Sequence, residues 1–156
     1  MIAFRMPANA THPREFYRES SVRAMKETGR FQRGVAHFNA REFFESHEVW
    51  EEIWLAAPEP EKTFLQGMIQ IAAAFHHYGR GNMRGMKSLL AAGLARISGF
   101  PGDHREIALE RFRAEAGKWM DALAASKDLG PRKLPKIRPA GRSSPLRAKR
   151  KKKSGG

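Results

Sequence analysis

The stretch Phe38–Leu55, FNAREFFESHEVWEEIWL, constrains the fold of this 156-residue chain more than any other. Asn39 followed three residues later by Glu42 is a capping-box pattern, which begins a helix. Phe38 and Phe43 have the spacing of the hydrophobic staple that accompanies such a box. Two prolines soon after Leu55 indicate the helix end, because proline cannot donate the amide hydrogen bond that a helix interior needs. The sequence therefore predicts a helix that begins at Asn39.

This predicted helix carries its aromatic residues on one face. At 100° per residue, an arc of about 140° holds seven side chains, namely Leu55, Phe44, Glu51, His47, Trp54, Phe43 and Trp50. We interpret the arc as the buried face, so Trp54 is expected in the core. His47 and Glu51 then lie in the core face, with Glu48 at its rim. Because burying an unpaired charge is costly, these groups need partners, and the i, i+4 spacing lets His47 and Glu51 reach each other.

The positive charge of the chain is concentrated at its C-terminal end. The formal net charge is +13, and residues 127–156 hold twelve of the 29 lysines and arginines but only one of the 16 acidic residues. Residues 1–126 are therefore close to neutral. We interpret residues 127–156, which are rich in Lys, Arg, Pro, Gly and Ser, as a disordered tail. Its densest basic run is a candidate polyanion-binding site made of Arg147, Lys149, Arg150, Lys151, Lys152 and Lys153.

Helical periodicity extends over most of the remaining chain, and no stretch has the period-two alternation of a β-strand. After an irregular N-terminus, we expect further helices over about residues 13–25, 31–37, 61–78, 83–97 and 104–125. Gly81 and Asn82 form the turn before the helix at 83–97, which Asn82 can cap. Trp119 lies on the apolar face of the last helix and is expected in the core. The predicted fold is all-α, one compact bundle of four to five antiparallel helices over residues 11–126.

The helix over residues 61–78 is apolar almost all round, which predicts a central helix enclosed by others. One polar stripe interrupts it, and within about 80° it holds Thr63, Gln66, Gln70, Ala73 and His77. A short connection to the preceding helix predicts an antiparallel hairpin. We therefore expect His47 and Glu51 to meet Gln66, Gln70 and His77 in one polar seam.

Three interpretations of this seam are open. The first is a buried hydrogen-bond network that fixes the register of the hairpin. The second is a divalent metal site in which His47 and Glu51 are joined by Glu48 or His77, although the second histidine of the zinc-protease pattern His-Glu-x-x-His is missing. The third is an acid–base or ligand pocket in which Glu51 or Glu48 titrates beside His47.

Three blocks of this sequence together resemble a known family. They are FNAREFFESHEVWEEIW, FLQGMIQIAAAFHH and GNMRG, and the likeness covers about residues 31–123. The chain resembles domain of unknown function family 309, which consists of small all-helical proteins of bacteria and archaea. The family motif H-E-x-x-E-x-x-W falls on His47, Glu48, Glu51 and Trp54. The resemblance implies an all-α fold and no established activity, and it does not cover the basic tail.

The function hypotheses fall into three classes. The chain is a small helical binding or interaction module with a structural seam, a metal-assisted or acid–base hydrolase using His47, Glu48 and Glu51, or a protein that associates with nucleic acid through its basic tail. The sequence implies no cofactor other than the divalent metal of the second class, and self-association stays open. Cysteine is absent, which excludes disulfides and thiolate chemistry. Because neither a signal-peptide pattern nor a span-length apolar run is present, we expect a cytoplasmic protein with no membrane contact.

Overall fold

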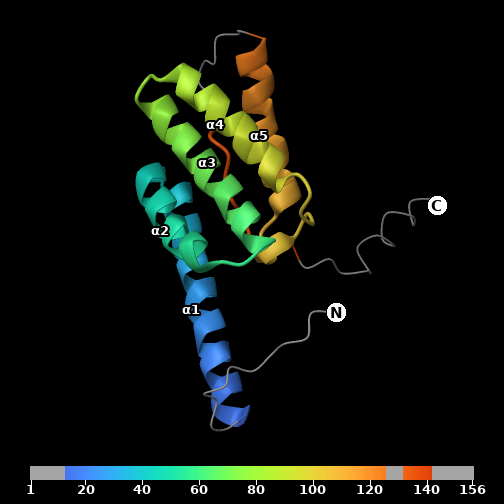
Figure 1. The fold of residues 1–156 in the computed structure, drawn as a ribbon. Helices are drawn as coiled ribbons and strands as arrows, with labels where there is room; N and C mark the ends of the chain where they lie inside the picture. The colour runs from blue at the N-terminus through green and yellow to red at the C-terminus, as the bar shows by residue number, and fades with distance from the viewer. Residues whose placement is uncertain (1–12, 126–131, 142–156) are drawn as a thin grey trace, which may run out of the picture.

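The computed structural model describes residues 13–125 and 132–141, which form one bundle of α-helices (Figure 1). The helices are α1 Pro13–Asn39, α2 Phe43–Ala56, α3 Glu61–Gly79, α4 Met83–Ile97 and α5 Leu109–Ala124, with a short 3-10 turn, η1, at His104–Glu106. The predicted all-α fold is confirmed. Among the described residues, no helix is long and apolar enough to cross a membrane.

Helix α1 is one continuous helix of 27 residues, whereas the sequence predicted two helices, over about residues 13–25 and 31–37, on either side of a break at Gly29. Its N-terminal part extends beyond the other helices, and its C-terminal part packs into the bundle (Figure 1). Phe31 and Phe38 are each only 1% exposed. Burying these two rings stabilises the helix by more than the roughly 1 kcal/mol that a glycine costs in a helix interior. The prediction of a break at Gly29 is therefore wrong.

The predicted helix start at Asn39 is also wrong. Asn39 is the last residue of α1, and α2 begins at Phe43 after Glu42, whose side chain makes no capping hydrogen bond. The staple contact is nevertheless present, because the rings of Phe38 and Phe43 pack edge to face with centroids 5.0 Å apart. The side chain of Asn39 binds the backbone of Ile137 instead of a helix N-terminus.

The buried face of α2 differs from the predicted aromatic arc. Its buried residues are Phe43, Ser46, Val49, Trp50 and Ile53, and Trp54 is only partly buried. Phe44 and Leu55, which the arc placed in the core, are 48% and 67% exposed. Trp50 decides the orientation of the helix, because its indole N–H donates to the carbonyl of Phe31 and Ser46 Oγ donates to the carbonyl of Gly34. These two bonds lock α2 to α1 along a face rotated away from the arc.

Helix α3 is the central helix, as the sequence predicts, and packs against both α2 and α4. Its fully buried residues include Phe64, Leu65, Met68, Ile71, Ala72, Ala74 and Phe75. At the α3–α4 crossing, a Cβ atom on Gly67 would lie 3.0 Å from the carbonyl oxygen of Gly93, and one on Gly93 would lie 2.7 Å from that of Gly67. The two glycines therefore permit the close approach of these backbones.

Residues 132–141 are not a disordered tail but a docked segment of the fold (red in Figure 1). Ile137 is 2% exposed and belongs to the hydrophobic core. The backbone N–H of Ala108 donates to the carbonyl of Arg138 at 2.7 Å, and that of Ala140 donates to the carbonyl of Glu106 at 2.8 Å. The prediction of disorder is therefore wrong for residues 132–141. The predicted irregular N-terminus (1–10), residues 126–131 and the basic run at 147–153 lie outside the described residues.

Candidate anion-binding site

A cavity of about 630 Å³ opens where the end of α1, one face of α5 and the docked segment 132–141 meet. Six of the nine residues that line it are basic and one is acidic, and the full set is Arg41, Glu115, Lys118, Trp119, Arg132, Lys133, Leu134, Lys136 and Arg138. The volume falls in the range of small-molecule sites, roughly 300–1,000 Å³. The excess of positive charge means that the cavity favours an anion.

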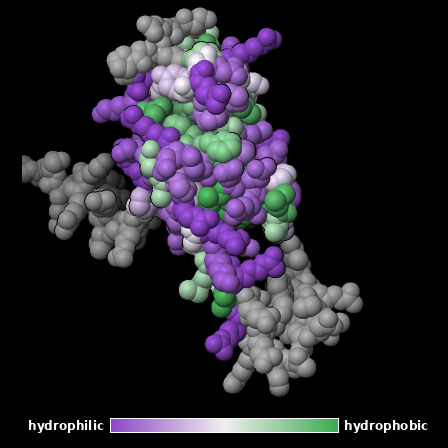
Figure 2. Space-filling view, turned by 90° about the vertical axis from the view of Figure 1, so that its left-hand side faces the viewer, coloured by the Kyte–Doolittle hydropathy of each residue, from purple (hydrophilic) through white to green (hydrophobic). Residues whose placement is uncertain are grey.

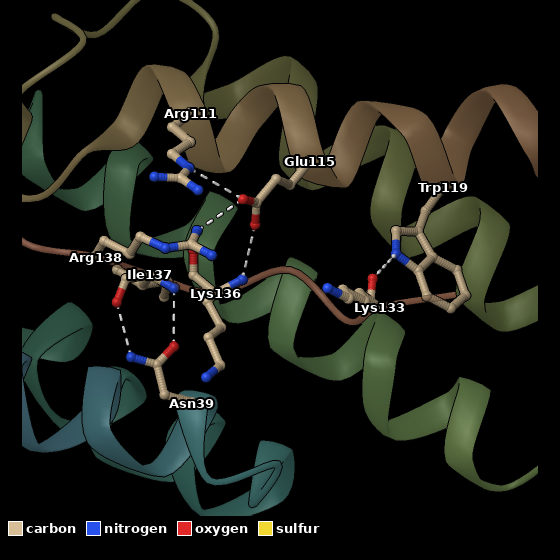
Figure 3. A network of polar contacts seen from close by, with 8 residues as sticks. All are labelled: Asn39, Arg111, Glu115, Trp119, Lys133, Lys136, Ile137 and Arg138. Carbon is tan, nitrogen blue, oxygen red and sulfur yellow. Dashed lines mark hydrogen bonds and ion pairs between the residues drawn. The ribbon is translucent and has the colours of Figure 1, made fainter. Parts of the chain in front are cut away.

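Helix α5 supplies the wall of the cavity through three side chains on one face, because Glu115, Lys118 and Trp119 follow the i, i+3, i+4 spacing. Trp119 is 2% exposed, which confirms its predicted place in the core. Its indole N–H donates to the carbonyl of Lys133 at 3.2 Å (Figure 3). The indole therefore ties the docked segment to α5, while its ring packs against Phe75 and Tyr78.

The single carboxylate of the cavity, Glu115, is already bound by several donors (Figure 3). It accepts hydrogen bonds from the backbone N–H of Lys136 at 3.0 Å, from Arg138 at 2.7 Å and from Arg111 at 3.3 Å. Partial burial alone would raise the pKa of Glu115, but these donors outweigh it and hold the pKa below its ordinary value. Glu115 is therefore a carboxylate at neutral pH whose charge is used to hold the docked segment.

Asn39 fixes the register of the docked segment on the opposite side (Figure 3). Its Oδ1 accepts from the backbone N–H of Ile137 at 2.8 Å, and its Nδ2 donates to the carbonyl of Ile137 at 2.7 Å. One amide thus satisfies both backbone groups of a core residue. A slip of the segment by one residue would break this pair and withdraw the Ile137 side chain from the core.

Five of the six cations of the cavity have no carboxylate partner in the part of the chain that the structure describes. Only Arg138 makes an ion pair, with Glu115, and the other five are Arg41, Lys118, Arg132, Lys133 and Lys136. Arg41 also has a left-handed backbone, with φ 67°, a conformation that favours glycine. Unpaired positive charge around a hollow is the arrangement that recruits an anionic ligand.

The predicted His47–Glu51 pair lies on α2 and does not line the cavity. Its Nδ1 and Oε2 atoms are 4.0 Å apart, and the Glu51 side chain is 49% exposed. Glu48 is exposed as well. On this side of the molecule the surface is mostly hydrophilic, with hydrophobic side chains among the polar ones (Figure 2). Glu48 and Glu51 therefore lie on a solvated face of α2 and not in the core. His47 is only partly buried, and its Nδ1 atom is buried with no hydrogen-bond partner among the described residues.

The polar stripe of α3 faces elsewhere. Gln70 accepts from Nε of Arg96 on α4 at 3.1 Å, and His77 contacts the amide of Asn82 at 3.1 Å. Among the described residues, no hydrogen bond joins Gln66, Gln70 or His77 to the His47–Glu51 pair. The structure thus keeps the two halves of the predicted seam apart. Asn82 also caps α4, as predicted, because its Oδ1 accepts from the backbone N–H of Gly85.

The predicted metal set of His47, Glu51 and His77 is likewise not gathered. Within residues 13–125 and 132–141, no three His, Cys, Asp or Glu side chains form a group that could hold a metal ion. The ring of His47 instead stacks on that of Phe44, one turn earlier on α2, and Phe44 packs across the α2–α3 hairpin against His76 with centroids 5.5 Å apart.

Comparison with known proteins covers only part of this architecture. Residues 31–89 match the model of the family described as "Domain of unknown function (DUF309)". The predicted resemblance is confirmed over this segment. The DUF309 match contains Arg41 and the His47–Glu51 pair, whereas α5 and residues 132–141, which build the rest of the cavity, follow it.

Two curated relatives extend the comparison. The chain is 32% identical over 91 residues to the "Uncharacterized protein YpuF" of Bacillus subtilis (strain 168), an overlap that covers 57% of this chain and 49% of YpuF. It is 28% identical over 94 residues to an "Uncharacterized protein" of Aquifex aeolicus (strain VF5), covering 60% of this chain and 27% of that protein. The chain therefore spans half or less of the length of these relatives.

Sequence reasoning missed the cavity because it assigned its residues to separate classes. Lys136 and Arg138 fell in the segment interpreted as a disordered tail, whereas Glu115 and Lys118 lie on the last predicted helix and Arg41 near the start of the helix at Asn39. One signal for docking was present, since Leu134 and Ile137 are apolar residues between prolines in an otherwise basic segment. An apolar residue in such a segment gains free energy by packing on the body.

Proposed function

We propose that this protein is a small helical binding module that associates with nucleic acid through charge, without reading the base sequence. The observation that supports this most is the cavity, where six basic residues surround a hollow and the one carboxylate is already bonded to two arginines. The basic run at Arg147 and Lys149–Lys153, outside the described residues, follows the docked segment in the chain and adds charge next to it in sequence. A phosphodiester backbone is the abundant cellular polyanion that such a surface fits.

Two features support recognition by charge and not by base. The Trp119 ring is 2% exposed and makes edge-type contacts with the rings of Phe75 and Tyr78, so it offers no exposed platform on which a base could stack. Six of the other eight lining residues are Arg or Lys, whose side chains contact phosphate oxygens readily. We therefore expect equal affinity for unrelated sequences and a strong dependence on salt concentration. A cytoplasmic location, expected from the sequence, is part of this proposal.

The experiment compares the full chain with charge variants in binding to two labelled duplexes of unrelated sequence. Lys118→Glu should weaken binding several-fold and flatten the slope of log K against log salt by about one or more, because a phosphate contact is lost. The matched control is Lys87→Glu, an exposed lysine on α4 that does not line the cavity. Equal binding by both variants would remove the cavity from the interface. If replacing residues Lys149–Lys153 with glutamine leaves binding unchanged, the basic run is not part of the interface.

A metal-assisted or acid–base hydrolase centred on His47, Glu48 and Glu51 has weaker support. A general base with a raised pKa needs burial or a like-charged neighbour, and both glutamates are exposed. A catalytic pair must also lie within hydrogen-bonding reach, and Nδ1 of His47 is 4.0 Å from Glu51. Nucleic-acid association is therefore the function that we favour.

A further inference from the structure

The cavity has a property that a flat basic surface does not have. It is a hollow of about 630 Å³ with cations on several walls, namely Arg41 from the α1–α2 turn, Lys118 from α5 and Lys136 from the docked segment. These three segments are far apart in sequence, and the hydrogen bonds of Asn39 and Glu115 hold them in fixed relation. A ligand that enters the hollow therefore meets positive charge from several directions at once.

Arg41 is held in this position at a cost. The end of α1 closes with two backbone hydrogen bonds, from Arg41 N–H to the carbonyl of Phe38 and from Glu42 N–H to the carbonyl of His37. In such a helix end the residue at the Arg41 position is left-handed and is commonly glycine, which has no steric penalty there. With arginine instead of glycine at this position, the backbone is less stable, but a guanidinium group is placed on the cavity wall. A strained residue that lines a cavity is a reason to assign it a binding role.

The number of unpaired cations selects the ligand. A single carboxylate carries one negative charge and would leave four of the five unpaired cations of the cavity uncompensated. A terminal phosphate carries about −1.5 to −2 charges and three strong acceptor oxygens, so it compensates more of this positive charge and can accept from Arg41, Lys118 and Lys136 on their separate walls. A phosphate within a nucleic-acid chain carries a single charge and has the chain continuing on both sides. A hollow with converging cations fits the end of a chain better than its middle.

We propose that this cavity binds a terminal phosphate group, either at the 5′ end of a nucleic acid or on a free polyphosphate. The nucleic-acid form of this inference rests on the proposed function, and the polyphosphate form does not. Arg41, Lys118 and Lys136 are the residues that contact the phosphate. Asn39 and Glu115 are positioning residues, because they act by fixing the docked segment that carries Lys136.

The test uses the full chain and two probes. Binding of inorganic tripolyphosphate is measured by calorimetric titration. Binding of a short single-stranded oligonucleotide is measured by fluorescence anisotropy, once with a 5′-phosphate and once with a 5′-hydroxyl group. The decisive variant is Arg41→Gly, because glycine relieves the left-handed backbone and removes the guanidinium. We expect Arg41→Gly to unfold at an unchanged or higher urea concentration while its Kd for tripolyphosphate rises by about tenfold. Lys118→Ala should also weaken binding, and Lys87→Ala on α4 should not.

The outcomes separate the two proposals. The phosphate site is refuted if the wild-type chain does not bind tripolyphosphate. It is also refuted if Arg41→Gly and Lys118→Ala bind tripolyphosphate as tightly as the wild type does. Either result would stand even if duplex DNA still binds. A 5′-phosphorylated oligonucleotide that binds about tenfold tighter than its 5′-hydroxyl form supports the site with a nucleic-acid end as its source. Equal binding of both oligonucleotides, with variant-sensitive binding of tripolyphosphate, supports the site with a free polyphosphate as its source.

Discussion

The bond between Asn39 and Ile137 gives the sharpest prediction about the fold, because sequence and structure assign Asn39 different roles. Asn39→Ala leaves the N–H and the carbonyl of Ile137 without partners in a partly buried place. A stranded buried polar group costs about 1–3 kcal/mol, so two groups with some access to water should cost about 2–4 kcal/mol together. A lost helix cap would cost about 1 kcal/mol.

Urea denaturation followed by far-ultraviolet circular dichroism measures this cost. The matched control is Asn82→Ala, which removes the cap of α4 and should cost about 1 kcal/mol. Hydrogen exchange adds a local readout, since the amides of Ala108 and Ala140 are bonded across the junction with the docked segment and should exchange faster in Asn39→Ala. The reasoning fails if Asn39→Ala costs no more than Asn82→Ala and leaves both amides equally protected.

The remaining predictions concern other parts of the bundle. The folded-state pKa of Glu115 is lowered, so its contribution to stability is present at neutral pH and is lost as the pH falls through that pKa. In urea titrations, Glu115→Gln should therefore lose less stability than the wild type between about pH 7 and about pH 3. Gly93→Ala should destabilise the protein by about 1–3 kcal/mol, because its Cβ atom would clash with the α3 backbone. Gly29→Ala, which has open space around it, should stabilise the protein by up to about 1 kcal/mol. Equal shifts in melting temperature for the two variants would contradict the close approach of α3 and α4. The changes in unfolding free energy of Glu51→Ala and Gln70→Ala should add within about 0.5 kcal/mol, since Gln70 is bonded to Arg96 and not to Glu51. A larger coupling energy in a double-mutant cycle would support the single polar seam that the sequence predicted.

The helical parts of the fold were predictable because they depend on local patterns. The apolar α3, the turn at Gly81 and the cap at Asn82 all follow from periodicity and turn chemistry, and the structure has them. The buried face of α2 was not predictable from its aromatic residues. Its rotation is fixed by bonds from Trp50 and Ser46 to carbonyls of another helix, and such long-range partners leave no mark in the local pattern.

The candidate site was less predictable than the fold, for the same physical reason. A basic, proline-containing segment has the composition of a disordered tail, and only its contacts with distant residues order it. Asn39 lies 98 residues from its partner Ile137, and its spacing to Glu42 matched a local motif better. The sequence analysis favoured His47 and Glu51 as candidates because histidine and glutamate are common catalytic residues. Their exposure depends on the orientation of α2, which the tertiary structure decides.

The anion site can be tested most directly through the indole N–H signals of the three tryptophans in a nitrogen–proton correlation spectrum of the full chain. The Trp119 indole N–H is bonded to the carbonyl of Lys133 at the cavity wall, whereas that of Trp50 is bonded to the carbonyl of Phe31 inside the core. If an anion occupies the cavity, titration with tripolyphosphate should move the Trp119 signal along a saturable curve and leave the Trp50 signal in place. Tripolyphosphate binding that leaves the Trp119 signal unmoved would show that the anion binds elsewhere.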